Sequence, residues 1–255
     1  MITDPLFYLF AIPAVLIVGI SKGGLGGGLG LIAVPLMALV IPPFKAAAIL
    51  LPILCVMDLV SMWGFRGRYD SRNLKILLPG AILGIGLGAL TVQYLSETHI
   101  KLIIGVIALL FTLNFGINKL RKRSPKKTSA DPIKGGLWGT LAGFTSFSVH
   151  AGGPPMNIYL LPQQLDKTLF AGTTVIFFAV INFVKLVPYS LLGLFESDNL
   201  MTSLALVIFA PIGVFTGIWM HKRINDTWFY LICYGLLFLT SLKILNDALG
   251  ELLQH

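Results

Sequence analysis

The sequence predicts an all-α protein that crosses a lipid bilayer several times. Of its 255 residues, 56% are hydrophobic and only 12% are charged, whereas soluble domains average about 25% charged residues. Apolar runs recur along the chain, each close to the roughly 20 residues that cross a bilayer as a helix. These runs lack the alternation of polar and apolar residues that a membrane β-barrel needs, so helices are the expected spanning elements.

The first half of the chain begins with a broken apolar segment. Residues 1–42 lack the basic stretch that begins a cleaved signal peptide, and the glycine-rich sequence "SKGGLGGGLG" interrupts them. We expect a hairpin broken at these glycines. The apolar runs 45–63, 76–95 and 102–117 follow, and each is predicted to be a membrane-spanning helix.

The second half repeats this order of elements. Its broken segment, 135–162, contains "TSFSVHAGGPP" and precedes the apolar runs 169–194, 200–220 and 228–245. Two full crossings need roughly 40 residues, so the segment 135–162 is too short to cross twice. We therefore expect a re-entrant hairpin. An alternative in which the hairpins are longer helices, giving eight or more spans, stays open.

The polar segment 119–134 divides the chain into two repeats, 1–118 and 135–255, which suggests an internal duplication. Most of the 19 Lys and Arg residues lie in the short loops 64–75, 119–134 and 221–226, and this asymmetry predicts that those loops are cytoplasmic. An odd number of crossings in each half then inverts the second repeat relative to the first. The positive net charge therefore indicates how the chain is oriented in the membrane. We expect no nucleic-acid binding.

The two breaks are predicted to form one binding site. Backbone that leaves a helix at membrane depth must line a cavity, and paired breaks in inverted repeats indicate the substrate site. Helices that begin after Gly28 and near Pro154 would direct free N–H groups and partial positive charge at an anion. Lys22 adds a full charge and is expected to face an anion or a carboxylate. The predicted substrate-binding residues are Ser21, Lys22, Gly23, Gly24, Gly26, Gly27, Gly28, Ser146, Ser148, His150, Gly152, Gly153, Pro154 and Asn157.

Polar residues within the spans suggest coupling to protons. Asp58 and Asn182 hold similar positions in the two halves, and we predict that both take part in coupling, with Asp58 as the proton carrier. Asp58 and Lys185 are expected either to pair or to relay protons, although the position of Lys185 nearer a membrane face predicts that its ammonium reaches the surface. Simpler alternatives make Lys22 another surface-reaching lysine and His150 a buried core residue.

Other motifs argue against an enzyme. The spaced glycines of "GLWGTLAG" and "GAILGIGLG" are typical of closely packed membrane helices. Neither H-E-x-x-H nor G-x-S-x-G occurs, and "GLGLIA" lacks the βαβ setting of a dinucleotide site. Cys55 and Cys233 stand alone, without metal-ligand spacing. We expect no catalysis, no cofactor and no metal site.

The paired motifs resemble those of a known family. "GISKGGLGGGLGLIAVPLM", "GFTSFSVHAGGPPMNIYLL", "LLPGAILGIGLGAL" and "FAPIGVFTGIWM" together cover both halves and are similar to the sulfite exporter TauE/SafE family. The resemblance implies a bacterial inner-membrane permease for small anions such as sulfite, sulfonates or related organic acids, and it favours export. The stretch "SVHAGGPP" departs from the family pattern, so a role for His150 would be particular to this chain.

We therefore predict a secondary transporter that moves a small anion across the cytoplasmic membrane, with the lipid bilayer as its surroundings. Coupling to protons and assembly into a homodimer stay open. The alternatives from other classes are an anion channel and a membrane-embedded enzyme.

Overall fold

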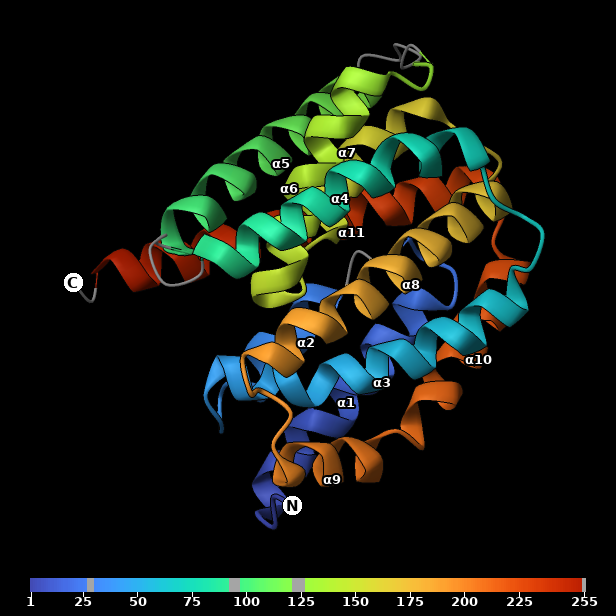
Figure 1. Ribbon diagram of the computed structural model, residues 1–255. Helices are drawn as coiled ribbons and strands as arrows, with labels where there is room; N and C mark the ends of the chain where they lie inside the picture. Colours follow the sequence, from blue (N-terminus) through green and yellow to red (C-terminus); the bar gives the residue numbers. More distant parts are fainter. Residues whose placement is uncertain (27–29, 92–96, 121–126, 254–255) are drawn as a thin grey trace.

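The structure, a computed structural model, describes residues 1–26, 30–91, 97–120 and 127–253. Figure 1 shows that these residues form helices joined by loops, with no strand among them. Five helices of the described part (α1, α3, α4, α8 and α11) are long and apolar enough to cross a membrane, and the bent pair α9–α10 makes a sixth candidate. The prediction of an all-α, multi-pass membrane protein is confirmed. The elements are α1 (Pro5–Lys22), α2 (Gly30–Met37), α3 (Pro43–Gly64), α4 (Ser71–Thr91), α5 (Glu97–Leu120), α6 (Pro132–Val149), α7 (Gly153–Leu160), the 3₁₀ turn η1 (Leu161–Gln163), α8 (Lys167–Leu191), α9 (Ser197–Leu206), α10 (Phe209–Arg223) and α11 (Asp226–Leu253).

Aspartate side chains fix the starts of three helices. Asp4 accepts a hydrogen bond from the first turn of α1, Asp131 from the first turn of α6 and Asp166 from the first turn of α8. Each carboxylate satisfies N–H groups that have no partner within the helix. These caps place the entrances of both broken segments and of the central helix α8.

The apolar run 200–220 is not one straight span. It is divided into α9 and α10, which meet at an angle of 44°. Pro211 lies in the first turn of α10 and has no N–H to donate to the carbonyl of Val207, so the helix cannot continue regularly through this point. The expectation of one continuous span over residues 200–220 is therefore wrong.

Helix α4 packs against α6 through closely spaced glycines. A Cβ atom at Gly84 would lie 2.0 Å from the carbonyl oxygen of Thr140, and one at Gly143 would lie 2.0 Å from that of Ala81. Only glycine permits backbones to approach this closely. The prediction that "GLWGTLAG" and "GAILGIGLG" serve helix packing is confirmed.

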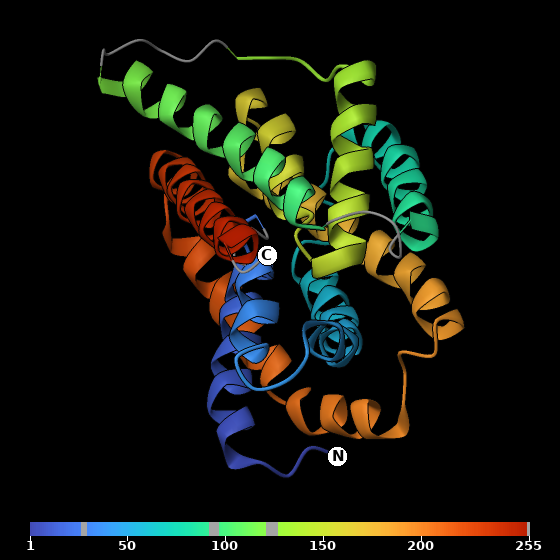
Figure 2. The ribbon, with the colours of Figure 1, turned by 90° about the vertical axis from the view of Figure 1, so that its left-hand side faces the viewer.

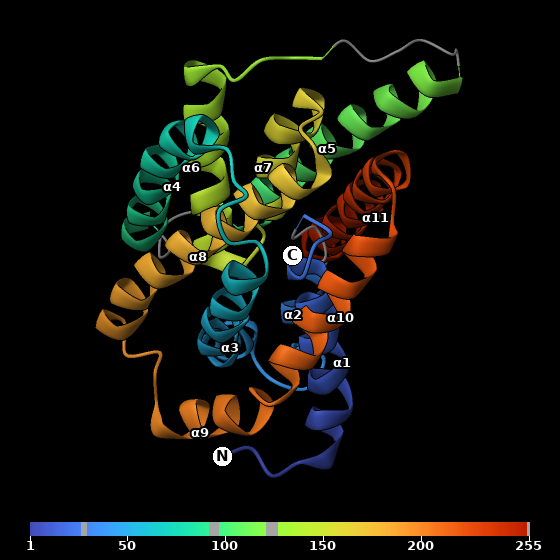
Figure 3. The ribbon, with the colours of Figure 1, turned by 90° about the vertical axis from the view of Figure 1, so that its right-hand side faces the viewer.

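Helix α1 packs against α10 in the same manner. Gly19 lies against Gly213, and Gly23 lies against Gly217, with the Cβ position of Gly23 2.3 Å from the carbonyl oxygen of Val214. Helix α4 of the first half therefore packs against the first helix of the second half, and α10 of the second half packs against the first helix of the first half. Figure 3 shows α1 and α10 on one side and α4 and α6 on the other, with α3 and α8 between them.

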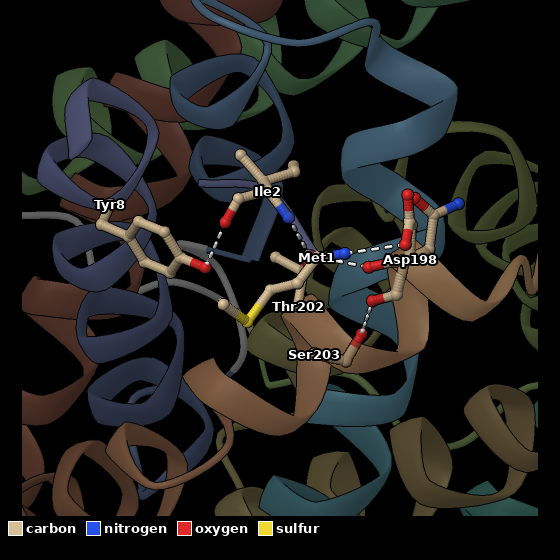
Figure 4. A network of polar contacts seen from close by, with 7 residues as sticks. Met1, Ile2, Tyr8, Asp198, Thr202 and Ser203 are labelled. Carbon is tan, nitrogen blue, oxygen red and sulfur yellow. Dashed lines mark hydrogen bonds and ion pairs between the residues drawn. The ribbon is translucent and has the colours of Figure 1, made fainter. Parts of the chain in front are cut away.

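Two further helix pairs complete the molecule. Helices α5 and α11 lie side by side, as Figure 2 shows, and α3 packs against α8 at the centre. Just before the start of α1, the Met1 amine pairs with Asp198 at 2.8 Å, and the Ile2 N–H donates to Thr202 (Figure 4). Ser203 donates to the Ile49 carbonyl at 2.7 Å, so this network ties α9 to both α1 and α3.

Candidate functional site: a buried cationic cavity where two broken helices meet

The two chain breaks approach each other inside the molecule. After α1 ends, Gly24 and Gly26 have φ angles of +144° and +70°, which other residues rarely adopt. A Cβ at Gly26 would lie 3.7 Å from Oδ1 of Asn157 in α7. Ala151, in the second break, packs with Ile32 of α2. The predicted convergence of the two breaks is therefore observed for their described residues; Gly27 and Gly28 lie outside the described part.

Lys22 makes a buried ion pair at the end of α1. Its ammonium binds Oδ1 of Asp58 on α3 and lies 5.5 Å from the centre of the Phe178 ring. Asn182 on α8 donates to the other carboxylate oxygen of Asp58 at 2.7 Å. The side chains of Lys22 and Asp58 are 8% and 1% exposed. Lys22 was expected to face an anion or a carboxylate. It faces a carboxylate, and its ammonium does not reach the surface.

Lys185 forms a second buried centre at the end of α6. Its ammonium donates to the carbonyl and the hydroxyl of Ser146, both at 3.0 Å, and contacts Nδ1 of His150 at 2.7 Å. The residue is fully buried. The expectation that Lys185 extends to a membrane face is wrong, because the polar groups exposed by the break of α6 offer its ammonium three acceptors inside the protein. Asp58 pairs with Lys22 and not with Lys185.

Hydrogen-bond roles limit the charge of the Lys185–His150 pair. Nε2 of His150 lies 3.1 Å from the carbonyl oxygen of Ala47, which can only accept, so this nitrogen carries a proton. Lys185 and His150 cannot then both be cations, because two cations cannot donate to each other across the Nζ–Nδ1 contact. The pair therefore carries at most one positive charge, and it carries that charge when Lys185 is protonated.

This charge has no carboxylate partner. Asp58 is the one acidic side chain that is buried among the described residues, and its two oxygens bind Lys22 and Asn182. An isolated charge in a low-dielectric interior is strongly unfavourable unless something compensates for it. When Lys185 is protonated, the site therefore favours an anion beside it.

A small cavity connects the two centres. It measures about 20 Å³, room for about one water molecule. The end of α1, the end of α6 with the second break, α3 and α8 contribute to its wall. The lining residues are Val18, Lys22, Leu54, Ser146, His150, Phe178 and Asn182.

The cavity wall has matching positions from the two halves. Asp58 and Asn182 are 124 residues apart, and the same separation relates Lys22 to Ser146 and Leu54 to Phe178. The halves therefore place equivalent positions around one point while supplying different side chains there.

The remaining predicted site residues take several positions. Gly23 packs against α10, and Gly24 contacts the ring of His221, which also binds the Gly24 carbonyl oxygen at 3.0 Å. Ser148 is half-buried and donates back to the carbonyl of Phe144. Ser21 is buried at the end of α1, and Gly152, Gly153 and Pro154 are buried around the start of α7. None of these residues lines the cavity.

Asn157 is the other predicted residue of the second break. It is 1% exposed, and its Oδ1 atom has no hydrogen-bond partner in the described structure. Of the fourteen substrate-binding residues predicted, Lys22, Ser146 and His150 line the cavity, as does the predicted coupling residue Asn182.

Sequence reasoning missed the contribution of Lys185. A signal was present, because Lys185 follows Asn182 by three residues and so lies on the same face of α8. Among the described side chains, no group of three His, Cys, Asp or Glu residues is placed to hold a metal ion.

Comparison with known proteins identifies the family. The family described as Sulfite exporter TauE/SafE matches residues 11–244, a span that includes both broken segments and every residue of the cavity wall. Comparison with curated proteins and with solved structures gave no significant match. The resemblance noted from the glycine motifs is confirmed. The chain belongs to the sulfite exporter TauE/SafE family of membrane transporters.

Proposed function

We propose that this protein is a secondary transporter that exports a small sulfur-containing or organic anion, such as sulfite or a sulfonate, across the inner membrane. The observation that supports this proposal best is the buried Lys185–His150 pair beside the cavity, which has no carboxylate partner among the described residues. A bound anion would stabilise the positively charged form of this pair. The Ser146 hydroxyl and the Asn182 amide add polar groups to the same wall.

The packing supports an arrangement of two inverted repeats, 1–118 and 135–255, joined by a cytoplasmic linker at 119–134. Helix α4 runs parallel to α6, since Leu77 meets Gly139 and Ala81 meets Gly143 farther along. Helix α1 runs parallel to α10 by the same reasoning from Gly19 and Gly23. The start of α4 and the end of α10 share one end of the molecule, where Phe65 contacts His221. The helices α1 and α6 therefore run in opposite directions, as re-entrant hairpins of inverted repeats would.

The size of the cavity favours a transporter over an open channel. A space for about one water is too small for a sulfur oxyanion. Binding therefore requires the broken segments, or the helices that carry them, to move apart. Such a movement alternately opens the site to each side in transporters with inverted repeats. A membrane-embedded enzyme is disfavoured by membership of a family of transporters.

Flux in proteoliposomes tests this function. Purified protein should exchange internal for external anion, with rates that saturate, and a panel of sulfite, thiosulfate, sulfoacetate, methanesulfonate and small carboxylates should identify the substrate. Because exchange requires a binding site that opens to both sides in turn, unlabelled substrate inside the vesicles should accelerate uptake of labelled substrate. Unsaturable anion currents without such acceleration would indicate a channel and contradict the proposal.

A further inference from the structure

The charged groups around the cavity can be counted. Lys22 on α1, Asp58 on α3, and Lys185 on α8 with His150 after α6 are the buried charged or readily charged groups at this point. The other titratable groups that face them are the Cys55 thiol on α3 and the Tyr189 hydroxyl on α8. Tyr189 donates to the carbonyl of Phe147 at 2.8 Å, and both groups are neutral in their ordinary protonated forms.

With Asp58 ionised, these groups can carry at most a single net positive charge. Lys22 and Asp58 cancel each other through their ion pair. The Lys185–His150 pair carries at most one positive charge, because the Ala47 carbonyl fixes the proton on Nε2 of His150 and two cations cannot donate to each other. A bound anion favours the charged form of this pair. A singly charged anion would bring the cavity to neutrality, whereas a doubly charged anion would leave a negative charge buried without a partner.

We infer that the cavity binds anions in their singly charged form, and that a doubly charged anion enters only together with a proton taken up by Asp58. This inference rests on the proposed transport function and specifies the charge state of its substrate. The substrate class is a hydrogensulfite, a sulfonate or a monocarboxylate.

Asp58 is placed to accept that proton. It is the one buried carboxylate of the described chain, and one of its oxygens already binds the Lys22 ammonium. A proton on Asp58 removes the negative charge that compensates Lys22, so the cavity then carries two positive charges. The proton comes from water on the side from which the anion enters, and it leaves with the anion on the other side.

Sulfate and methanesulfonate provide matched probes. Both are tetrahedral sulfur oxyanions, but sulfate is doubly charged near neutral pH and methanesulfonate is singly charged. Their affinities for the wild-type protein should be measured side by side by competition against transported substrate. If sulfate binds with one extra proton, the ratio of sulfate to methanesulfonate affinity should fall about tenfold for each unit of pH increase. Titration of the shared cation cancels in this ratio.

Charge variants separate the roles of the two centres. Asp58→Asn leaves Lys22 uncompensated, so sulfate should gain affinity relative to methanesulfonate and the pH dependence of the ratio should disappear. Adding Lys22→Gln to Asp58→Asn restores one net charge and should restore the preference for methanesulfonate. The wild-type pH series remains decisive if a variant fails to fold.

The outcomes distinguish this inference from the function on which it rests. A wild-type protein that binds and moves no anion contradicts the transport function itself. A protein that transports anions with a ratio independent of pH contradicts the inference alone. An Asp58→Asn variant that folds and keeps the wild-type ratio and pH dependence also contradicts it.

Discussion

The two halves of the molecule present equivalent positions to the cavity with different electrostatics. In the first half, Lys22 is neutralised by Asp58. In the second half, Asn182 takes the position equivalent to Asp58, and Lys185 takes the position equivalent to Ser61, whose hydroxyl has no hydrogen-bond partner in the described structure. The second half thus gains a cation and lacks the matching carboxylate.

The two halves combine similar helix packing with different charges at the cavity. Glycine contacts and helix pairings are alike in the two halves, so the repeats share the features that set helix positions. The positions that surround the cavity carry different charges in the two halves. A duplicated membrane protein can therefore acquire anion selectivity by changing a few side chains while its packing stays constant.

The largest expected loss of stability comes from breaking the Lys22–Asp58 ion pair. Lys22→Ala leaves Asp58 buried without its cation, and removing one partner of a buried pair costs roughly 3–5 kcal/mol of stability. Lys185→Gln removes a charge that has no carboxylate partner, so its stability loss should be much smaller. Thermal unfolding of both variants in the same detergent measures the difference. Equal losses would remove the contrast between the halves.

The next effect concerns the matched glycine interfaces. A methyl group at Gly143 or Gly217 would lie 2.0 Å from the Ala81 oxygen or 2.3 Å from the Ile20 oxygen. Gly143→Ala and Gly217→Ala should each lower stability by about 1–3 kcal/mol, because these backbone atoms must shift. Gly86→Ala, where a Cβ meets nothing within 4 Å, is the control and should cause no loss. If only one interface responded in unfolding experiments, the halves would not be equivalent in packing.

The smallest effect concerns the partner of Lys185. His150→Gln replaces two ring nitrogens by one side-chain amide. The amide can keep the contact with Ala47 or the contact with Lys185, but not both. The loss of one neutral hydrogen bond should weaken anion affinity by about 2- to 10-fold. Competition binding with methanesulfonate measures this change. A complete loss of binding by a folded variant would mean that histidine, and not lysine, holds the anion.

Much of the fold was predictable from the composition and from the positions of clustered Gly and Pro residues. Apolar runs predicted the helical membrane class, and clustered Gly and Pro residues predicted breaks after α1 and α6, because these residues either permit unusual backbone angles or lack an N–H. The pairing of α1 with α10 was not predictable, since spaced glycines mark a packing surface without naming its partner. The bend before Pro211 was not predicted, although the missing N–H of this proline is a signal for it.

The site was predictable in part for similar reasons. A lone lysine beside dense glycine singled out Lys22, and matching depths singled out Asp58 with Asn182. The buried position of the Lys185 ammonium depends on the direction of its side chain and on the acceptors that Ser146 of α6 supplies. The distance of Lys185 from the end of its helix predicts neither of these. The sequence therefore predicted where the cavity forms better than which cation remains uncompensated.

Anion binding by Lys185→Gln tests whether the buried Lys185–His150 pair holds the anion. Thermal unfolding should be measured with increasing methanesulfonate for the wild type, for Lys185→Gln, and for Lys75→Gln, an exposed lysine on α4 that serves as the matched control. Loss of a charge-assisted contact of roughly 1.5–3 kcal/mol predicts that the folded Lys185→Gln variant needs about 10- to 150-fold more anion for equal stabilisation, while Lys75→Gln behaves like the wild type. Equal stabilisation of Lys185→Gln and the wild type would contradict the assignment of this buried charge as the anion site.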